Sequence, residues 1–123
     1  MLSQQEINKR VKFGLSQEKF LYNQLNNIFG NLNKFDNKYS RFDFYNNEYL
    51  IELKSRNCKY KSYPSSMVGL NKLQYKDTLN RKKVFIFNFI DGVYRWNADT
   101  EYQIKKFNNK DYIYIDINNL IKI

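Results

Sequence analysis

The 123-residue chain contains no histidine. This absence excludes Ser-His-Asp triads, HExxH zinc hydrolases, His-metal nucleases of the ββα type and ribonucleases that depend on histidine. The chain has a single cysteine, Cys58, which permits no internal disulfide and has no histidine to activate it as a nucleophile. Any catalysis must therefore use carboxylates, lysine, tyrosine or a metal ion held by oxygen ligands.

Long apolar runs are missing as well. The chain has no apolar stretch of the length that spans a membrane, and its first residues, MLSQQEINKR, lack the apolar core of a signal peptide. An intracellular protein is therefore expected. Apolar residues make up 42% of the chain and aromatic residues 18%, which favours a folded protein, and the length suits one domain over residues 1–123.

The formal net charge is +9. A strongly basic surface favours a polyanionic partner, and nucleic acid is the most common one. A second explanation stays open at this point. The chain is rich in Asn, Lys and Ile, as proteins from AT-rich genomes are, and the charge would then reflect genome composition and solubility.

Capping and turn signals predict the order α, α, β, β, α, β, β, β. A capping box at Ser3–Glu6 opens a short helix, Gly14 interrupts it, and Ser16 caps a second helix that Gly30 ends. A further helix is predicted from about residue 65 to 79, after the only proline, and residues 101–110 are predicted to be a polar connection.

Strongly apolar runs predict the central strands. Residues 81–90 and 93–97 should form a hairpin, because Asp91-Gly92 is the strongest turn signal in the chain. Trp96 and the alternating phenylalanines of residues 85–89 are expected in the core. Together the elements predict an α/β fold with a central mixed sheet of about five strands, flanked by helices.

The stretch SRFDFYNNEYLIELKSR, residues 40–56, contains charges within two apolar strands. With a two-residue loop at Asn46-Asn47, Asp43 would face Leu50 and Arg41 would face Glu52. Side chains alternate between the faces of a strand, so the charged residues would share one face and the apolar ones the other.

Asp43 and Glu52 would then be diagonal neighbours, with Cα atoms roughly 7–8 Å apart. Two converging carboxylates with open water positions suit Mg²⁺ or Mn²⁺. Lys54 points the same way and could contact a phosphate or polarise an attacking water. The other explanation is an ordinary hairpin with one solvated face and the cross-strand pairs Arg41–Glu52 and Asp43–Lys54.

An aspartate in one strand and Glu-X-Lys in the next, preceded by a helix with a glutamate, resemble the PD-(D/E)XK nuclease superfamily. Here the pieces are Asp43 and IELK, which contains Glu52 and Lys54. The later helix and the hairpin KKVFIFNFIDGVYRW follow in the order of that fold, so the resemblance covers residues 12–117. It is closest to small viral and resolvase-like members, although Phe42 replaces the proline before the aspartate.

The resemblance implies a restriction-endonuclease-like core and metal-dependent hydrolysis of DNA, in repair, recombination or replication. Asp43, Glu52 and the Leu53 carbonyl would hold Mg²⁺ or Mn²⁺, and Lys54 would assist the attacking water. Glu18 would be an auxiliary metal ligand. A first-turn glutamate favoured by the helix dipole explains Glu18 equally well.

Five further residues are candidate nucleic-acid contacts. Lys72 and Gln74 follow the motif on a predicted helix, where related enzymes place phosphate contacts. Arg56, Lys59 and Lys61 form a basic loop with interleaved tyrosines, which could follow a backbone and stack on unpaired bases. Solvated surface lysines and a surface loop explain the same residues.

Three functions therefore stay open. The first is a metal-dependent DNA endonuclease, the second a non-catalytic nucleic-acid-binding module, and the third a structural protein. The sequence does not distinguish junction, flap, nicked duplex, single-stranded or RNA substrates. A catalytic core of this size covers little nucleic acid alone, so a homodimer that cuts two strands is expected.

Overall fold

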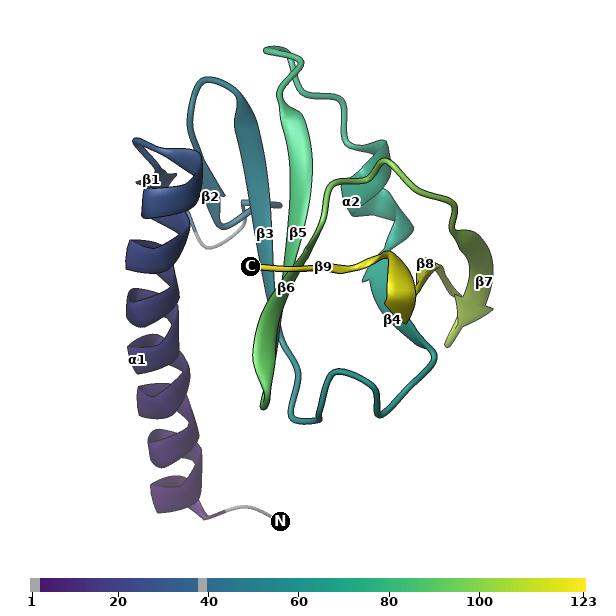
Figure 1. Cartoon of the computed structure of the whole chain (residues 1–123). Helices are drawn as coiled ribbons and strands as arrows, with labels where there is room; N and C mark the ends of the chain where they lie inside the picture. Colours follow the sequence, from purple (N-terminus) through teal and green to yellow (C-terminus); the bar gives the residue numbers. More distant parts are fainter. Residues whose placement is uncertain (1–2, 38–39) are drawn as a thin grey trace. The chain divides into compact units, whose positions relative to one another are not determined.

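The computed structural model describes residues 3–37 and 40–123, except for the side chains of residues 10–18. The chain divides into two compact units, Met1–Leu32 and Asn33–Ile123. The first contains a single helix, and the second contains all the strands (Figure 1).

The first unit is the helix α1, Gln4–Phe29. The predicted cap at Ser3 is confirmed, because the Glu6 N–H donates to the Ser3 hydroxyl at 3.2 Å, and Gly30 ends the helix with a φ of 79°. The predicted break at Gly14 and the second start at Ser16 are wrong. A glycine inside a helix costs only about 1 kcal/mol, which a long helix tolerates. No helix among the described residues is both long and apolar enough to cross a membrane.

The second unit contains a six-stranded mixed sheet, which confirms the expected α/β class. Its strands, in spatial order, are β1 (Asn33–Lys34), β2 (Phe44–Tyr45), β3 (Tyr49–Ser55), β5 (Lys82–Phe89), β6 (Gly92–Trp96) and β9 (Ile121–Lys122). β3 and β5 are parallel, and the other neighbours are antiparallel. The crossover from β3 to β5 runs through β4 and the helix α2.

A smaller, antiparallel sheet was not predicted. It contains β4 (Ser65–Gly69), β8 (Lys110–Asp116) and β7 (Gln103–Phe107), in the order β4-β8-β7. The predicted helix over residues 65–79 is wrong, since only α2, Leu70–Gln74, is helical. Residues 65–69 pair with β8 and bury Ser66 and Val68 alternately. The predicted polar connection at 101–110 is also wrong, because it contains β7 and the turn to β8.

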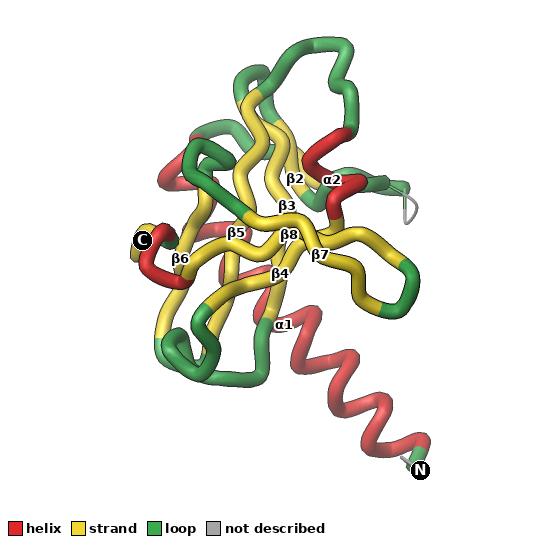
Figure 2. The backbone as a smooth tube through the Cα atoms, turned by 90° about the vertical axis from the view of Figure 1, so that its right-hand side faces the viewer, coloured by secondary structure: helices red, strands yellow, loops and turns green. Residues whose placement is uncertain are grey.

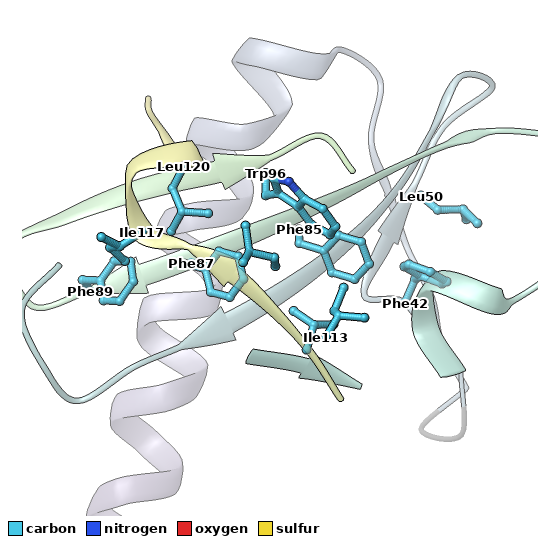
Figure 3. Close-up of a cluster of buried hydrophobic side chains, with 11 residues drawn as sticks. Phe42, Leu50, Phe85, Phe87, Phe89, Trp96, Ile113, Ile117 and Leu120 are labelled. Atoms are coloured by element: carbon cyan, nitrogen blue, oxygen red, sulfur yellow. The ribbon is translucent and has the colours of Figure 1, made fainter. Parts of the chain in front are cut away.

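The main core of this unit lies between the two sheets (Figure 3). The six-stranded sheet contributes Phe85, Phe87 and Trp96, which are fully buried as predicted. The smaller sheet contributes Val68 and Ile113. Figures 1 and 2 show β4, β7, β8 and α2 together on one side of the six-stranded sheet. The smaller sheet and α2 therefore cover this face of the six-stranded sheet.

The short helix α2 is anchored to β5 by Lys83. The Lys83 ammonium donates to the Leu73 carbonyl at 2.6 Å and to the Tyr75 carbonyl, at the end of α2. Just before β5, Arg81 and Asp77 form a two-pronged ion pair at 2.9 Å, which lowers the pKa of Asp77 to about 2. These contacts hold α2, and the Lys72 that it carries, in a defined position.

Candidate active site

The hairpin that carries the predicted site has a different register from the one expected. Phe44 pairs with Ile51 and Tyr45 with Leu50, a shift of two residues from the predicted pairing. The turn lies one residue later than predicted, at Asn47-Glu48. The Asn46 N–H donates to the Tyr49 carbonyl at 3.1 Å, and the Asn46 side chain accepts the N–H groups of Glu48 and Tyr49 at 2.8 Å each. Because the side-chain period is also two, the shift leaves each residue on its predicted face.

The corrected register places Asp43 beside Glu52. The Asp43 N–H donates to the Ile51 carbonyl at 2.9 Å, and its carboxylate Oδ2 accepts the Leu53 N–H at 2.7 Å. These two bonds bracket Glu52 on the neighbouring strand. In an extended strand the N–H and C=O of one residue point to the same side, so the Leu53 carbonyl is directed toward the Asp43 side of β3.

Glu52 lies on a covered face, and not on the solvated face of the simple hairpin considered above. It shares its face of β3 with the core residue Leu50, and only 6% of its surface is exposed. Burial raises the pKa of Glu52, and the negative charge of Asp43 raises it further, while Lys54 and Lys72 act in the opposite direction. A buried carboxylate with a raised pKa is typical of functional sites, although structural ion pairs produce the same effect.

Two lysines neutralise Glu52. The Lys54 Nζ lies 3.5 Å from Glu52 Oε1, and the Lys72 Nζ lies 3.1 Å from Oε2. Lys72 also donates to the Arg41 carbonyl. The alternative pairs Arg41–Glu52 and Asp43–Lys54 are not among the ion pairs of the described residues, where Glu52 pairs with the two lysines.

A cleft of about 480 Å³ opens beside these lysines. Lys54, Lys72 and Gln74, three of the predicted site residues, line it. On the other side it is lined by Lys110, Asp111 and Tyr112 of β8, which the sequence did not single out. The only sequence feature that could have indicated them is a lysine at the start of a strand with alternating apolar residues. The pairing of β8 with β4 places them next to α2, which follows β4. The cleft therefore has three cationic side chains, Lys54, Lys72 and Lys110, and one carboxylate, Asp111.

The basic loop of residues 56–63 is partly structural. The Arg56 guanidinium donates to the Met67 carbonyl at 2.7 Å, and its burial lowers the pKa of Arg56. Tyr60 stacks on Tyr94 with ring centroids 3.8 Å apart, and its hydroxyl donates to the Ile117 carbonyl. Lys59 and Lys61 are exposed. Tyr63 is exposed too, as are Asn57 and Ser62.

The remaining predicted ligand, Glu18, lies in α1, and its side chain falls outside the described residues. Among the described side chains, no group of three or more Cys, Asp or Glu residues comes together as a ready metal site. Asp43 and Glu52 form a pair of carboxylates. The candidate site therefore comprises this pair, the Leu53 carbonyl and the lysines of the cleft.

Comparisons with protein-family models, with curated proteins and with solved structures returned no match for this chain.

The burial of Glu52 leads to a pH-dependent prediction about stability. Because the pKa of Glu52 is raised in the folded state, folding takes up a proton between the ordinary and the raised pKa. The charge on Glu52 then lowers stability as the pH rises through this window. In metal-free buffer, Glu52→Gln should therefore have a melting temperature a few degrees higher than the parent at pH 7, with the difference vanishing at pH values below about 4.

Thermal melts followed by circular dichroism at several pH values test this expectation. Glu48→Gln is the matched control, since Glu48 is an exposed carboxylate near the turn of the same hairpin. Its melting curve should follow that of the parent throughout. A Glu52→Gln protein less stable than the parent at pH 7 would show that the ion pairs with Lys54 and Lys72 outweigh the burial of the charge.

Proposed function

We propose that the protein is a divalent-metal-dependent nuclease that hydrolyses phosphodiester bonds in DNA. The observation that carries this proposal is the arrangement around Glu52. Its buried carboxylate stands beside Asp43, with Lys54 at 3.5 Å, next to a cleft lined by lysines. Carboxylates that can hold a cation, a lysine beside them and a cleft lined by lysines are a combination that supports hydrolysis of a polyanion.

The topology around the site supports the same proposal. The aspartate directly precedes β2, and Glu-X-Lys lies within β3, which is antiparallel to β2. A crossover that contains the helix α2 then leads to β5, which is parallel to β3. This is the order that the resemblance to the PD-(D/E)XK superfamily predicts. A restriction-endonuclease-like core is therefore part of the proposal.

The donor set suits Mg²⁺ or Mn²⁺. Both ions prefer oxygen ligands, which Asp43, Glu52 and the Leu53 carbonyl would supply. Glu52 Oε2 is buried and accepts no hydrogen bond of good geometry from a described residue, although Lys72 lies 3.1 Å away. Asp43 and Glu52 would repel each other less when they hold such an ion than they do alone.

A bound metal ion would supply Lewis-acid activation of water and of the phosphate. The residues of the chain would do the rest. Lys54, next to Glu52, would orient the attacking water, and Lys72 and Gln74 would contact phosphate oxygens in the cleft. By resemblance to the superfamily, the products would carry a 5′-phosphate and a 3′-hydroxyl.

One observation favours a second function, a non-catalytic nucleic-acid-binding module. Lys54 and Lys72 together already neutralise Glu52, so the carboxylate has ammonium partners without a metal ion. In that case the same lysines would stabilise the fold, and the cleft would bind a backbone without cutting it. The charge of +9 suits either function.

A cleavage panel separates the two functions. Labelled junction, flap, duplex and single-stranded DNA, with an RNA strand for comparison, are incubated with the protein in Mg²⁺, Mn²⁺ or EDTA. We expect cleavage of at least one DNA substrate with either metal and none in EDTA. Salt-dependent binding without cleavage of any substrate would contradict the nuclease proposal and favour the binding module.

A further inference from the structure

The outer face of the smaller sheet is an accessible surface with aromatic and basic side chains. Ile113 and Ile115 of β8 point into the core. Side chains alternate along a strand, so Lys110, Tyr112 and Tyr114 point outward. The pairs Lys105–Tyr112 and Phe107–Lys110 lie across β7 and β8 on this outward side, next to Tyr114. These five residues form what we call the outer face.

The aromatic rings of the outer face are accessible. Phe107 is 53% exposed, and its ring meets Tyr112 edge to face, with centroids 6.3 Å apart. Tyr114 is half-buried and carries the Lys105 ammonium 5.5 Å above its ring. All five residues of β7 are exposed. Neighbouring exposed aromatic side chains of this kind mark an interaction site more often than single exposed apolar residues do.

The charge of this face is positive. Residues 103–110 contain Lys105, Lys106 and Lys110 and no acidic residue. Asp111 and Lys106 pair with each other on the other side of the strands, and Asp111 lines the cleft. Glu101 and Asp116 line a hollow at the far end of the outer face, together with Lys105 and Tyr114. Interleaved lysines and accessible rings are the combination that binds unpaired nucleic acid, because ammonium groups contact phosphates and rings stack on bases.

The outer face is continuous with the cleft. Lys110 and Tyr112 belong to the outer face and also line the cleft that contains Lys54 and Lys72. A strand bound along β8 would therefore reach the lysines next to Glu52. A duplex offers no free base to stack on these rings, whereas a single strand does.

We propose that the outer face is a stacking platform for an unpaired nucleic-acid strand and leads that strand into the cleft. This inference rests on the proposed function of the cleft and identifies its substrate class as nucleic acid with a single-stranded segment. Phe107 is the main stacking ring, and Lys105 and Lys110 contact the backbone.

Binding measurements in EDTA test the platform without any cleavage. Fluorescence anisotropy is followed for a labelled single-stranded oligonucleotide and for the duplex of the same sequence, at several salt concentrations. Phe107→Ala should weaken single-strand binding about tenfold and change duplex binding little. Lys105→Gln with Lys110→Gln should reduce the slope of log K against log salt by about 1.4, since each lysine contributes about 0.7.

The chain offers matched controls in the same unit. Ile90→Ala truncates an exposed apolar side chain at the β5–β6 turn, and Lys82→Gln with Lys122→Gln removes the same charge from exposed positions of β5 and β9. Phe107→Leu keeps apolar packing against Tyr112 but loses the aromatic ring, so it separates a loss of stacking from a folding defect. It should also weaken single-strand binding, with a circular dichroism spectrum like that of the parent.

Each result has a defined meaning. Unchanged single-strand binding by both Phe107 variants, equal losses in the controls, or duplex binding as tight as single-strand binding would overturn the platform. Selective binding by a different class of partner, such as anionic vesicles, with no binding of oligonucleotides would also overturn it. Platform binding without cleavage in the panel would remove the nuclease proposal alone, and cleavage unaffected by the Phe107 variants would remove the platform alone.

Discussion

Replacement of Asp43 by asparagine is expected to reduce Mg²⁺-dependent cleavage on the order of a thousandfold, with nucleic-acid binding retained. The asparagine can still accept the Leu53 N–H that Asp43 accepts at 2.7 Å, so the backbone beside Glu52 should keep its position. What the substitution removes is the negative charge, and a divalent cation would lose a principal ligand. Asp43→Ala should lose as much activity and some stability as well, because the Leu53 N–H loses its acceptor.

Single-turnover cleavage of the best substrate from the panel measures this effect, and anisotropy in EDTA measures binding. Asp36→Asn is the matched control, since Asp36 is exposed and lies outside the cleft. It should cleave at the parent rate. If Asp43→Asn and Asp43→Ala both cleave like the parent, the carboxylate pair is not the metal site, and the proposed activity must be abandoned.

Replacement of Lys54 by glutamine is expected to lower the cleavage rate about a hundredfold while changing substrate affinity less than about threefold. The Lys54 ammonium lies 3.5 Å from Oε1 of Glu52, one of the carboxylates that would hold the metal ion, so its loss should affect the chemical step. If Lys54 instead bound the substrate equally well in the ground state and the transition state, its loss would raise KM and leave kcat unchanged.

Lys72→Gln provides the comparison for this prediction. Lys72 also pairs with Glu52, but it sits on α2 and donates to the Arg41 carbonyl. We expect its loss to weaken binding about tenfold and to change the chemical step less than the loss of Lys54 does. Measuring kcat and KM separately for both variants tests the difference. A parent-like kcat for Lys54→Gln would contradict the assigned role of Lys54.

The shared face of Asp43, Glu52 and Lys54 could be predicted from local sequence, even though the register was wrong. The alternation of charged and apolar residues in 41–54 depends only on the period of a strand. The turn lies one residue later in the chain than predicted, at Asn47-Glu48, which shifts the pairing by two residues and preserves the faces. A shift of one would have placed Glu52 on the opposite face.

Other features followed from equally local signals. The Ser3 cap, the end of α1 at Gly30 and the apolar strand β5 each depend on residues close together in the chain. The predicted break at Gly14 was wrong because it relied on a single local signal. The helix has 26 residues, and its other hydrogen bonds outweigh the cost of one glycine.

Pairing between strands far apart in the chain decided which elements surround the site. Residues 65–69 have helix-compatible side chains, yet they form β4 because β8, more than forty residues later in the chain, supplies hydrogen-bond partners. β7 has five exposed residues and no apolar alternation, so no local pattern could indicate it. The smaller sheet that these strands form covers the face of Glu52 and contributes Lys110 to the cleft.

The amino-acid sequence thus set the chemistry of the candidate site: two carboxylates and a lysine at spacings that place them on one side of a hairpin, in a basic chain without histidine. The surroundings of Glu52 came from tertiary structure. Whether its face would be wet or buried depended on a second sheet, and burial raises the pKa of Glu52. The physical reason is that strand alternation is a local property of the backbone, whereas desolvation depends on which distant segments pack against that strand.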